Sequence, residues 1–416
     1  MRQPSIHDLE PALARDARRI VETLEQAGHE AWLVGGAPRD LALERPVEDV
    51  DIATAATPDE IEALFPVVHA VGRAFGTLVV PGESGSIEVT TFRSEHGYSD
   101  GRRPDEVVFT RSLVDDAERR DFTANALYLQ PVTGELADPT GGLADIAARR
   151  LRAVGDAGKR FAEDGLRILR LARFAAVLDF AMEPATAYAA RRGLENLRGV
   201  SPERVTHEWE KAAKHGVVAR FATNLDLLGA LFVTHPALAA ALEGAGVDDR
   251  PDRARWLANL DASADAAFAL ATLHLPAGAF DAQRAEVALR SLHVSRAARN
   301  RALALWENVV QAAAPPLEPR AREWRRLAKP TFREDLCIAE LAGRVTPEDA
   351  ARWRRWGAER SVETPEPLLE ARDLLELGVA PGPEVGRLLR GLVDAQLEGR
   401  VQDVEEARAW VVGERA

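Results

Sequence analysis

The sequence GGAPRD at residues 35–40 follows directly on the apolar run AWLV at residues 31–34, and this junction decides the fold of the N-terminal part of the chain. The apolar run reads as a short buried strand, and the paired glycines allow the backbone to turn sharply after it. The N–H groups of such a turn can point at a phosphate group, and an arginine beside it adds a forked cationic donor. We therefore expect Gly35, Gly36 and Arg39 to bind the phosphates of a nucleotide.

Two aspartates in the next segment, EDVDI at residues 48–52, complete the pattern. The segment reads as a strand, whose period of two places Asp49 and Asp51 on one face and Val50 in the core. Carboxylate oxygens are ligands that Mg²⁺ prefers, and two such ions roughly 3.5–4 Å apart can activate a hydroxyl and neutralise a leaving pyrophosphate. The phosphate-binding turn and the acid pair together predict nucleotidyl transfer, with Asp49 and Asp51 as catalytic metal ligands.

A third acid lies in SIEVT at residues 86–90, which alternates like a strand. Glu88 stands between two apolar residues that would face inward. Two interpretations stay open at this point. Either Glu88 completes the metal site as a third catalytic carboxylate, or it is a structural partner of Arg93.

On these residues the chain resembles the class II tRNA nucleotidyltransferase and poly(A) polymerase family, within the DNA polymerase β superfamily. The segment RRDFTANA at residues 119–126 is similar to the family segment that binds the ribose and phosphates of the incoming nucleotide. Asp121 and Asn125 can hydrogen-bond a 2′-hydroxyl, and Arg120 can meet phosphate. The segment DPTGG at residues 138–142 resembles the hinge between the head and the neck of the family.

The segment EDGLRILR at residues 163–170 resembles the nucleobase-reading motif of the family. The polar residues that it contributes to nucleotide binding are Glu163, Asp164, Arg167 and Arg170. On a helix, Asp164 and Arg167 are neighbours at i,i+3, and their acceptor-plus-donor pattern matches cytosine and adenine but not guanine or uracil. Such a site selects CTP and ATP without a nucleic-acid template. The alternative is an ordinary surface ion pair, and Gly165 departs from the better helix former that is usual in the family.

The segment at residues 91–105 is dense in Gly, Ser, Asp and Arg, and it reads as a mobile loop, with a solvated hairpin tip as the alternative. It is similar to a loop that full CCA-adding and terminal A-adding members keep and CC-adding members lack. The resemblance therefore implies template-independent addition of CMP and AMP from CTP and ATP to the 3′ end of tRNA, with Mg²⁺ as cofactor. A terminal A-adding enzyme stays open, and a poly(A) polymerase is the weaker alternative.

Functions from other classes fit the sequence less well. A nucleotidyltransferase for small molecules would share the head but would not need a long helical tail. A nucleotide-sensing or RNA-binding protein without catalysis would not need both Asp49 and Asp51. The oligomeric state is not indicated by the sequence.

The composition is that of a folded protein without a membrane segment. Of 416 residues 46% are hydrophobic and 29% are charged, which excludes global disorder. A single cysteine, Cys337, excludes an internal disulfide and a cysteine zinc cluster. No run of about 18 apolar residues and no signal peptide are recognisable, so we expect no membrane contact and a cytoplasmic location.

A net charge of −13 is unusual for a protein that binds RNA phosphates. Basic residues are nevertheless concentrated between residues 149 and 173, beside the expected active site. Arginine and tryptophan also alternate at residues 322–326 and 352–356. These two clusters are either phosphate contacts with a stacking surface or helices with a tryptophan core face.

After residue 138 short strands give way to segments with helical periodicity. We therefore predict an α+β fold with a small N-terminal DNA polymerase β-like nucleotidyltransferase head, followed by an elongated all-α neck, body and tail. SPERV at residues 201–205 reads as a helix start with proline at the first position. The expected domains are the head at 1–140, the neck at 141–200, the body at 201–314 and a tRNA-binding tail at 315–416.

Overall fold

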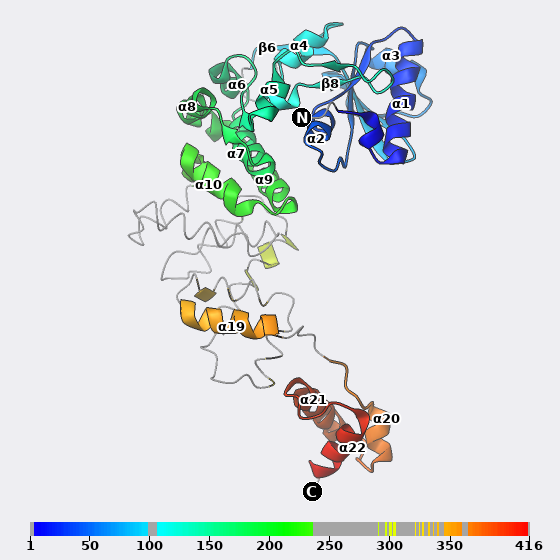
Figure 1. Cartoon of the computed structure of the whole chain (residues 1–416), viewed down its shortest axis with the longest axis vertical. Coiled ribbons are helices and arrows are strands. Elements are labelled where there is room, and N and C mark those ends of the chain that lie inside the picture. The colour runs from blue at the N-terminus through cyan, green and yellow to red at the C-terminus, as the bar shows by residue number, and fades with distance from the viewer. Residues whose placement is uncertain are drawn as a thin grey trace. The chain divides into compact units, whose positions relative to one another are not determined.

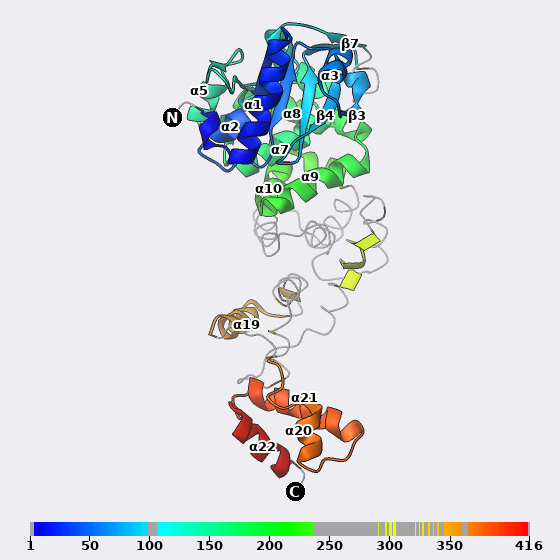
Figure 2. The ribbon, with the colours of Figure 1, turned by 90° about the vertical axis from the view of Figure 1, so that its right-hand side faces the viewer.

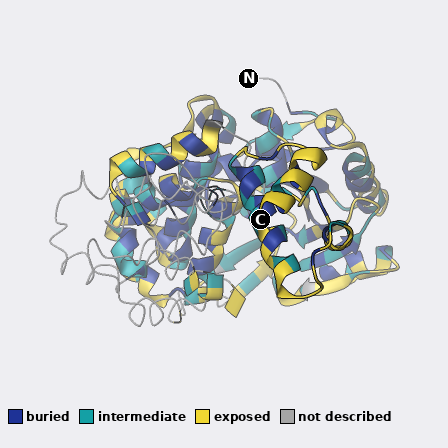
Figure 3. Ribbon diagram, turned by 90° about the horizontal axis from the view of Figure 1, so that it is seen from below, coloured by how far each residue is buried: buried dark blue, intermediate teal, exposed yellow. Residues whose placement is uncertain are grey.

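The computed structural model describes residues 4–98, 106–235, 345–359 and 365–414, with isolated residues between 290 and 340. The chain forms two compact units, residues 1–236 and 237–416 (Figure 1). In both units, exposed and buried residues alternate along the helices, as is typical of amphipathic elements (Figure 3).

A seven-stranded mixed sheet in the order β3-β4-β5-β2-β1-β8-β9 forms the centre of the N-terminal region. Its strands are β1 (Ala31–Val34), β2 (Asp51–Thr54), β3 (His69–Gly72), β4 (Thr77–Pro81), β5 (Ser86–Thr91), β8 (Tyr128–Leu129) and β9 (Leu136–Ala137). Strand β2 pairs in parallel with β5 and antiparallel with β1. The strands predicted at 31–34 and 86–90 are confirmed. The one predicted at 48–52 begins only at Asp51, although Val50 before it is buried.

Both faces of this sheet are covered, which explains the uninterrupted apolar run of β1. Helix α1 (Pro11–Gln26) lies along one face (Figure 2), and its Ile20 and Leu24 belong to one core with Leu33 and Ile52. A second core covers the other face, with Trp32, Val34, Ala53, Phe92 and Tyr128 among its members. The remaining helices of the head are α2 (Gly36–Ala42), α3 (Pro58–Leu64), α4 (Leu113–Glu118) and the 3₁₀ turns η1 (Ile6–Asp8), η2 (Arg73–Phe75) and η3 (Thr123–Asn125).

Part of the predicted mobile loop at 91–105 is a strand. Strands β6 (Arg93–His96) and β7 (Glu106–Phe109) form an antiparallel hairpin. The polar composition of β6 is accommodated because Arg93 and Arg119 both pair with Glu95. Residues 99–105 of the segment lie outside the described residues.

Helices dominate the rest of the first unit, as predicted. They are α5 (Gly142–Ala147), α6 (Ala157–Glu163), α7 (Leu166–Leu178), α8 (Pro184–Arg192), η4 (Leu194–Gly199), α9 (Pro202–Lys214), α10 (Val218–Leu228) and α11 (Ala230–Thr234). Helix α9 begins with proline after Ser201, as expected. A short parallel ladder of β10 (Arg150–Leu151) and β11 (Ala181–Met182) adds to the predicted helices.

The described part of the second unit is helical. It contains α19 (Pro347–Glu359), α20 (Ala371–Glu376), α21 (Pro383–Leu397) and α22 (Val404–Gly413), the last three around one core. Trp353 and Trp356 of α19 are buried and meet edge-on, so they pack inside rather than offer an open stacking surface. Trp324 is also buried, whereas its arginine neighbours and Cys337 lie outside the described residues. No helix among the described residues is long and apolar enough to cross a membrane.

Gly165 has a packing role that the sequence does not reveal. It precedes α7 with right-handed helical backbone angles, so no unusual φ requires a glycine. A Cβ at this position would lie 2.3 Å from the carbonyl oxygen of Asn196, which belongs to η4. The departure from a better helix former therefore allows two backbone segments to approach each other.

We predict that Gly165→Ala destabilises the protein by about 1–3 kcal/mol through overpacking. Helix propensity alone would favour alanine by about 1 kcal/mol, so the two effects have opposite signs. Urea unfolding measures the difference. Gly199→Ala is the control, because a Cβ there meets no atom within 4 Å. A Gly165→Ala protein as stable as the wild type would contradict the close approach.

Candidate active site

Three carboxylates share one face of the sheet where β2 and β5 meet. Asp51 is the direct partner of Glu88 in the parallel pair, and Asp49 lies two residues earlier. All three acids are exposed, whereas the intervening Val50 and the neighbouring Ile52 are buried. The predicted alternation of acids and core residues is confirmed.

The alternative role of Glu88 as a partner of Arg93 is wrong. The guanidinium of Arg93 binds the carboxylate of Glu95 and the carbonyl oxygen of Phe75. Glu88 faces the aspartates instead, because its register opposite Asp51 places both side chains on the same face.

The acids repel one another. Protein atoms around the Asp51 carboxylate reduce its hydration, and the charges of Glu88 and Asp49 add to this effect, so that the pKa of Asp51 rises to about 6 against the opposing charge of Arg120. An oxygen-only donor set with excess negative charge fits a divalent cation of the Mg²⁺ class. Within the described ranges, no three acid, histidine or cysteine side chains are already gathered closely enough to hold an ion.

The glycine turn lies against these carboxylates. Gly35 adopts φ 78° and ψ −121° before α2, a conformation that glycine takes without strain. A Cβ at this position would lie 3.6 Å from Oδ2 of Asp51 and 3.9 Å from Nη1 of Arg120. The turn, one carboxylate of the predicted metal site and one guanidinium therefore lie close together.

Arg120 is held in place by Asp116, a residue that the sequence pattern did not single out. The Asp116 carboxylate is fully buried and accepts hydrogen bonds from Arg119 (2.6 Å), Arg120 (2.8 Å) and the Tyr128 hydroxyl (2.7 Å). Despite its burial, the charges of Arg120 and Arg119 hold the pKa of Asp116 well below its usual range. The spacing i,i+4 from Asp116 to Arg120 was the available signal, but an acid near a helix start is usually explained by the helix dipole.

A chain of hydrogen bonds connects four of the predicted nucleotide-binding residues. Nη1 of Arg39 donates to Oδ1 of Asn125, and Nδ2 of Asn125 donates to Oδ1 of Asp121 at 3.1 Å. Nε of Arg170 donates to the other oxygen of Asp121 at 2.7 Å. Although burial opposes ionisation, the Arg170 charge and these hydrogen bonds lower the pKa of Asp121 to about 2. The four side chains fix one another, and Arg39, Asn125 and Asp121 are mostly buried.

Phe174 is a second residue that the sequence pattern did not reveal. Three guanidinium groups lie over its ring. Their Cζ atoms are 5.4 Å (Arg39), 5.1 Å (Arg170) and 4.2 Å (Arg173) from the centre of the ring. Such contacts favour cations over a π-face and limit their movement. The ring therefore joins α2 to α7 at the nucleotide-binding residues.

The expected helical pair of Asp164 and Arg167 does not form. Asp164 has an extended backbone (φ −147°, ψ 108°) between α6 and α7, and its side chain caps the N–H of Leu166 at 3.0 Å. Arg167 pairs with Glu163, whereas Asp164 receives two hydrogen bonds, at 3.1 and 2.7 Å, from Arg204 of α9. The N–H groups at the start of α7 require acceptors, and Asp164 supplies one of them from an extended backbone, so α6 and α7 do not form one continuous helix.

The Asp164 carboxylate can accept one more hydrogen bond in addition to those that it already receives. A carboxylate offers about four acceptor directions, and the Leu166 N–H and the two Arg204 bonds occupy three of them. The Asp164 side chain is therefore fixed in place with one acceptor direction left.

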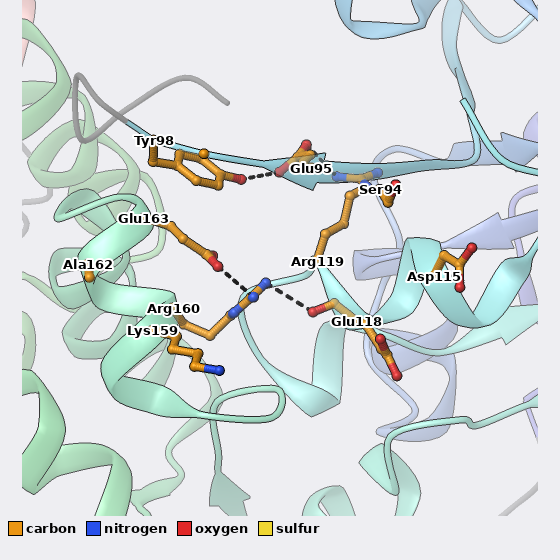
Figure 4. A pocket seen from close by; sticks show the side chains of 11 residues that line it. Ser94, Glu95, Tyr98, Asp115, Glu118, Arg119, Lys159, Arg160, Ala162 and Glu163 are labelled. Carbon is orange, nitrogen blue, oxygen red and sulfur yellow. Dashed lines mark hydrogen bonds and ion pairs between the residues drawn. The ribbon is translucent and has the colours of Figure 1, made fainter. Parts of the chain in front are cut away.

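A cavity of about 830 Å³ adjoins Arg167, between the β6–β7 hairpin, α4 and α6 (Figure 4). In it the Tyr98 hydroxyl donates to Glu95, and Arg160 connects Glu163 to the carbonyl oxygen of Glu118. Glu163 and the carbonyl group of Arg119 both bind the Arg167 guanidinium. Residues that line the cavity thus hold the side chain that was predicted to read the base.

The basic stretch between residues 149 and 173 is largely neutralised inside the protein. Its arginines pair with acids inside and outside the stretch: Arg149 with Asp179, Arg150 and Arg152 with Asp145, Arg160 and Arg167 with Glu163, Arg170 with Asp121, and Arg173 with Glu208. The stretch therefore organises the site more than it offers free charge to RNA.

Comparisons with known proteins agree with this geometry. A family profile described as the poly A polymerase head domain matches residues 31–152. The CCA-adding enzyme of Limosilactobacillus fermentum is 34% identical over 97% of this chain and 98% of that enzyme. The Leuconostoc citreum CCA-adding enzyme is 48% identical, and the alignment spans about half of each chain.

Solved structures give the same result. The Bacillus stearothermophilus CCA-adding enzyme in complex with CTP is 31% identical, with a TM-score of 0.63, and the match covers 98% of both chains. The Thermotoga maritima CCA-adding enzyme complexed with tRNA is 19% identical with a TM-score of 0.62 over 99% of this chain and 97% of that one, a likeness of fold.

The raised pKa of Asp51 predicts a pH-dependent stability difference. Its folded-state pKa of about 6 lies above the ordinary value of 3.8, so ionised Asp51 destabilises the folded protein increasingly from pH 4 to above pH 6. Asp51→Asn should raise the melting temperature at pH 7.5 in EDTA, and the gain should vanish near pH 4. Glu135→Gln, at an exposed carboxylate away from the site, should show no such trend. An equal melting temperature of Asp51→Asn and wild type at pH 7.5 would refute the repulsion.

Proposed function

This chain belongs to the family of CCA-adding enzymes, and we propose that it adds CMP and AMP to the 3′ end of tRNA, taking them from CTP and ATP without a nucleic-acid template. The observation that carries the proposal is the convergence of Asp51, the strand partner of Glu88, and Arg120 on the Gly35 turn. Acids for a metal ion, a cation for a triphosphate and a turn with free N–H groups are the parts that nucleotidyl transfer needs. Such an enzyme works where its tRNA, CTP and ATP are, which supports a cytoplasmic location.

Nucleotidyltransferases of this family use divalent metal ions, and we assign Mg²⁺ to Asp49 and Asp51, with Glu88 as the third carboxylate. When bound, Mg²⁺ makes the terminal 3′-hydroxyl a better nucleophile and neutralises charge on the leaving pyrophosphate. The Gly35 turn and Nη1 of Arg120 orient the triphosphate beside Asp51. Because Asp116 and Tyr128 hold the rest of the Arg120 guanidinium, this group needs no reorganisation during the reaction.

Selection of the nucleotide falls to the residues around α6 and α7. We assign Asp121 and Asn125 to the ribose hydroxyl of the incoming nucleotide, and the pair with Arg170 keeps Asp121 ionised as an acceptor. Asp164, with one acceptor direction left, suits a single exocyclic amine, as in cytosine and adenine. Arg167 supplies the donor for the ring nitrogen. Guanine and uracil would leave these groups unpaired, which disfavours GTP and UTP.

We predict that the enzyme completes tRNA transcripts that lack the whole CCA end and transcripts that lack only the final A. Each transcript is incubated with CTP, ATP or both, and its 3′ end is sequenced. Completion of both RNAs, followed by arrest, is the expected result, since one protein site can accept either base. The Asp49→Ala, Asp51→Ala double variant should stay folded and inactive. Extension of only the CC-ending transcript would identify a terminal A-adding enzyme, and activity of the folded double variant would refute the metal assignment.

We predict that Arg167→Ala lowers the preference for CTP over UTP, measured as the ratio of kcat/KM values, by roughly tenfold or more, because a hydrogen-bonding site loses its donor. Arg160→Ala is the matched control, since Arg160 also pairs with Glu163 but is assigned no contact with the base. Equal loss of selectivity in both variants would place the effect in Glu163 and contradict base reading by Arg167.

A further inference from the structure

RNA needs cations near the carboxylates, and most of the described arginines there are already paired. In the first unit, two lysines of α9 differ from the arginines. Lys211 and Lys214, about one turn apart, both interact with the segment that leads into β2: Lys214 forms an ion pair with Glu48, which places α9 beside this segment, and both lysines interact electrostatically with Asp49.

Lys211 has donors to spare. The nearest acidic oxygen, Oε1 of Glu208, is 3.9 Å from its Nζ, which is an ion-pair distance but not a hydrogen bond. Glu208 is itself buried, and its other oxygen binds Nε of Arg173 at 2.6 Å. Among the described residues, no acceptor lies within hydrogen-bond distance of the Lys211 ammonium. Burial and the nearby charges of Arg173 and Arg170 lower the pKa of Lys211 against the pull of Glu208 and Asp49. An additional anion at this position would relieve the excess of positive charge.

The lysine and the glycine turn approach the acids from different positions along the strand. The Gly35 turn and Arg120 lie against Asp51, where the triphosphate is assigned. Lys211 interacts electrostatically with Asp49. Asp49 is two residues before Asp51, and two residues of extended chain span roughly 6–7 Å. An in-line reaction places the attacking and leaving groups on opposite sides of the reacting phosphorus, so the two ends of the acid pair suit different substrates.

We propose that Lys211 binds the 3′-terminal phosphodiester of the RNA that receives the nucleotide, and thereby positions the terminal hydroxyl beside Asp49. This inference rests on the proposed function and adds to it a specific contact between α9 and the acceptor RNA. Lys214 also interacts electrostatically with Asp49, but its ammonium already pairs with Glu48, so we assign the phosphodiester contact to Lys211 alone.

The test uses the full chain and an acceptor-stem RNA that ends in CC. Binding is measured in EDTA over a range of salt concentrations for wild type, Lys211→Met, Lys211→Arg and Lys214→Met. Lys211→Met should weaken binding roughly tenfold and reduce the slope of log K against log salt concentration by about one, as loss of one phosphate contact requires. Lys211→Arg should restore most of the affinity, and Lys214→Met should behave like wild type. An RNA without its single-stranded 3′ end should bind Lys211→Met and wild type equally.

Steady-state kinetics separate the two sources of phosphate. The proposal expects Lys211→Met to raise KM for the RNA while KM for ATP stays unchanged. A rise in KM for ATP alone would assign the lysine to the triphosphate and overturn the proposal, as would unchanged RNA binding. Equal melting temperatures exclude a folding defect. Because wild-type AMP addition to the same RNA tests the proposed function separately, failure of one is distinguishable from failure of the other.

Discussion

Repulsion between like charges is the constraint on which the rest of this structure depends. The parallel pairing of β2 and β5 holds Asp51 directly beside Glu88, an arrangement that is unfavourable for the strands by themselves. The two apolar cores on either side of the sheet supply the stabilisation that keeps these strands in register. The carboxylate face that we propose as the metal site is therefore maintained by apolar side chains of the two cores.

The arginines of the site are held by opposite charges, in contrast to the carboxylates. Buried acids fix the arginines: Asp116 holds Arg119 and Arg120, Asp121 holds Arg170, and Glu208 holds Arg173. Each acid is enclosed by protein, and Asp116 and Asp121 stay ionised despite their burial because their partners are positive. The cost of ordering long side chains is met during folding rather than in each catalytic cycle, which is the condition for electrostatic preorganisation.

Local patterns predicted the parts of the site that lie on strands. The period of two was sufficient to place Asp51 of β2 and Glu88 of β5 on one face, whereas Asp49 precedes the strand. The helical i,i+3 spacing predicted a pair of Asp164 with Arg167, and this prediction was wrong. Asp164 instead caps the N–H of Leu166 and pairs with Arg204. Asp116, Phe174 and Arg204 were missed because their contacts join segments that are distant in sequence or mimic ordinary helix chemistry. A single sequence contains no direct signal for such contacts.

The bond between Asp164 and Arg204 links two positions that are 40 residues apart. Replacement of either one alone leaves a partly enclosed charge without its partner, which is costlier than the loss of both. On the proposed role of Asp164 in base reading, nucleotide preference therefore cannot change by single neutral substitutions at this residue. The two codons are under joint selection, and a lineage that changes its preferred base at this position must pass through a destabilised intermediate or change both residues together.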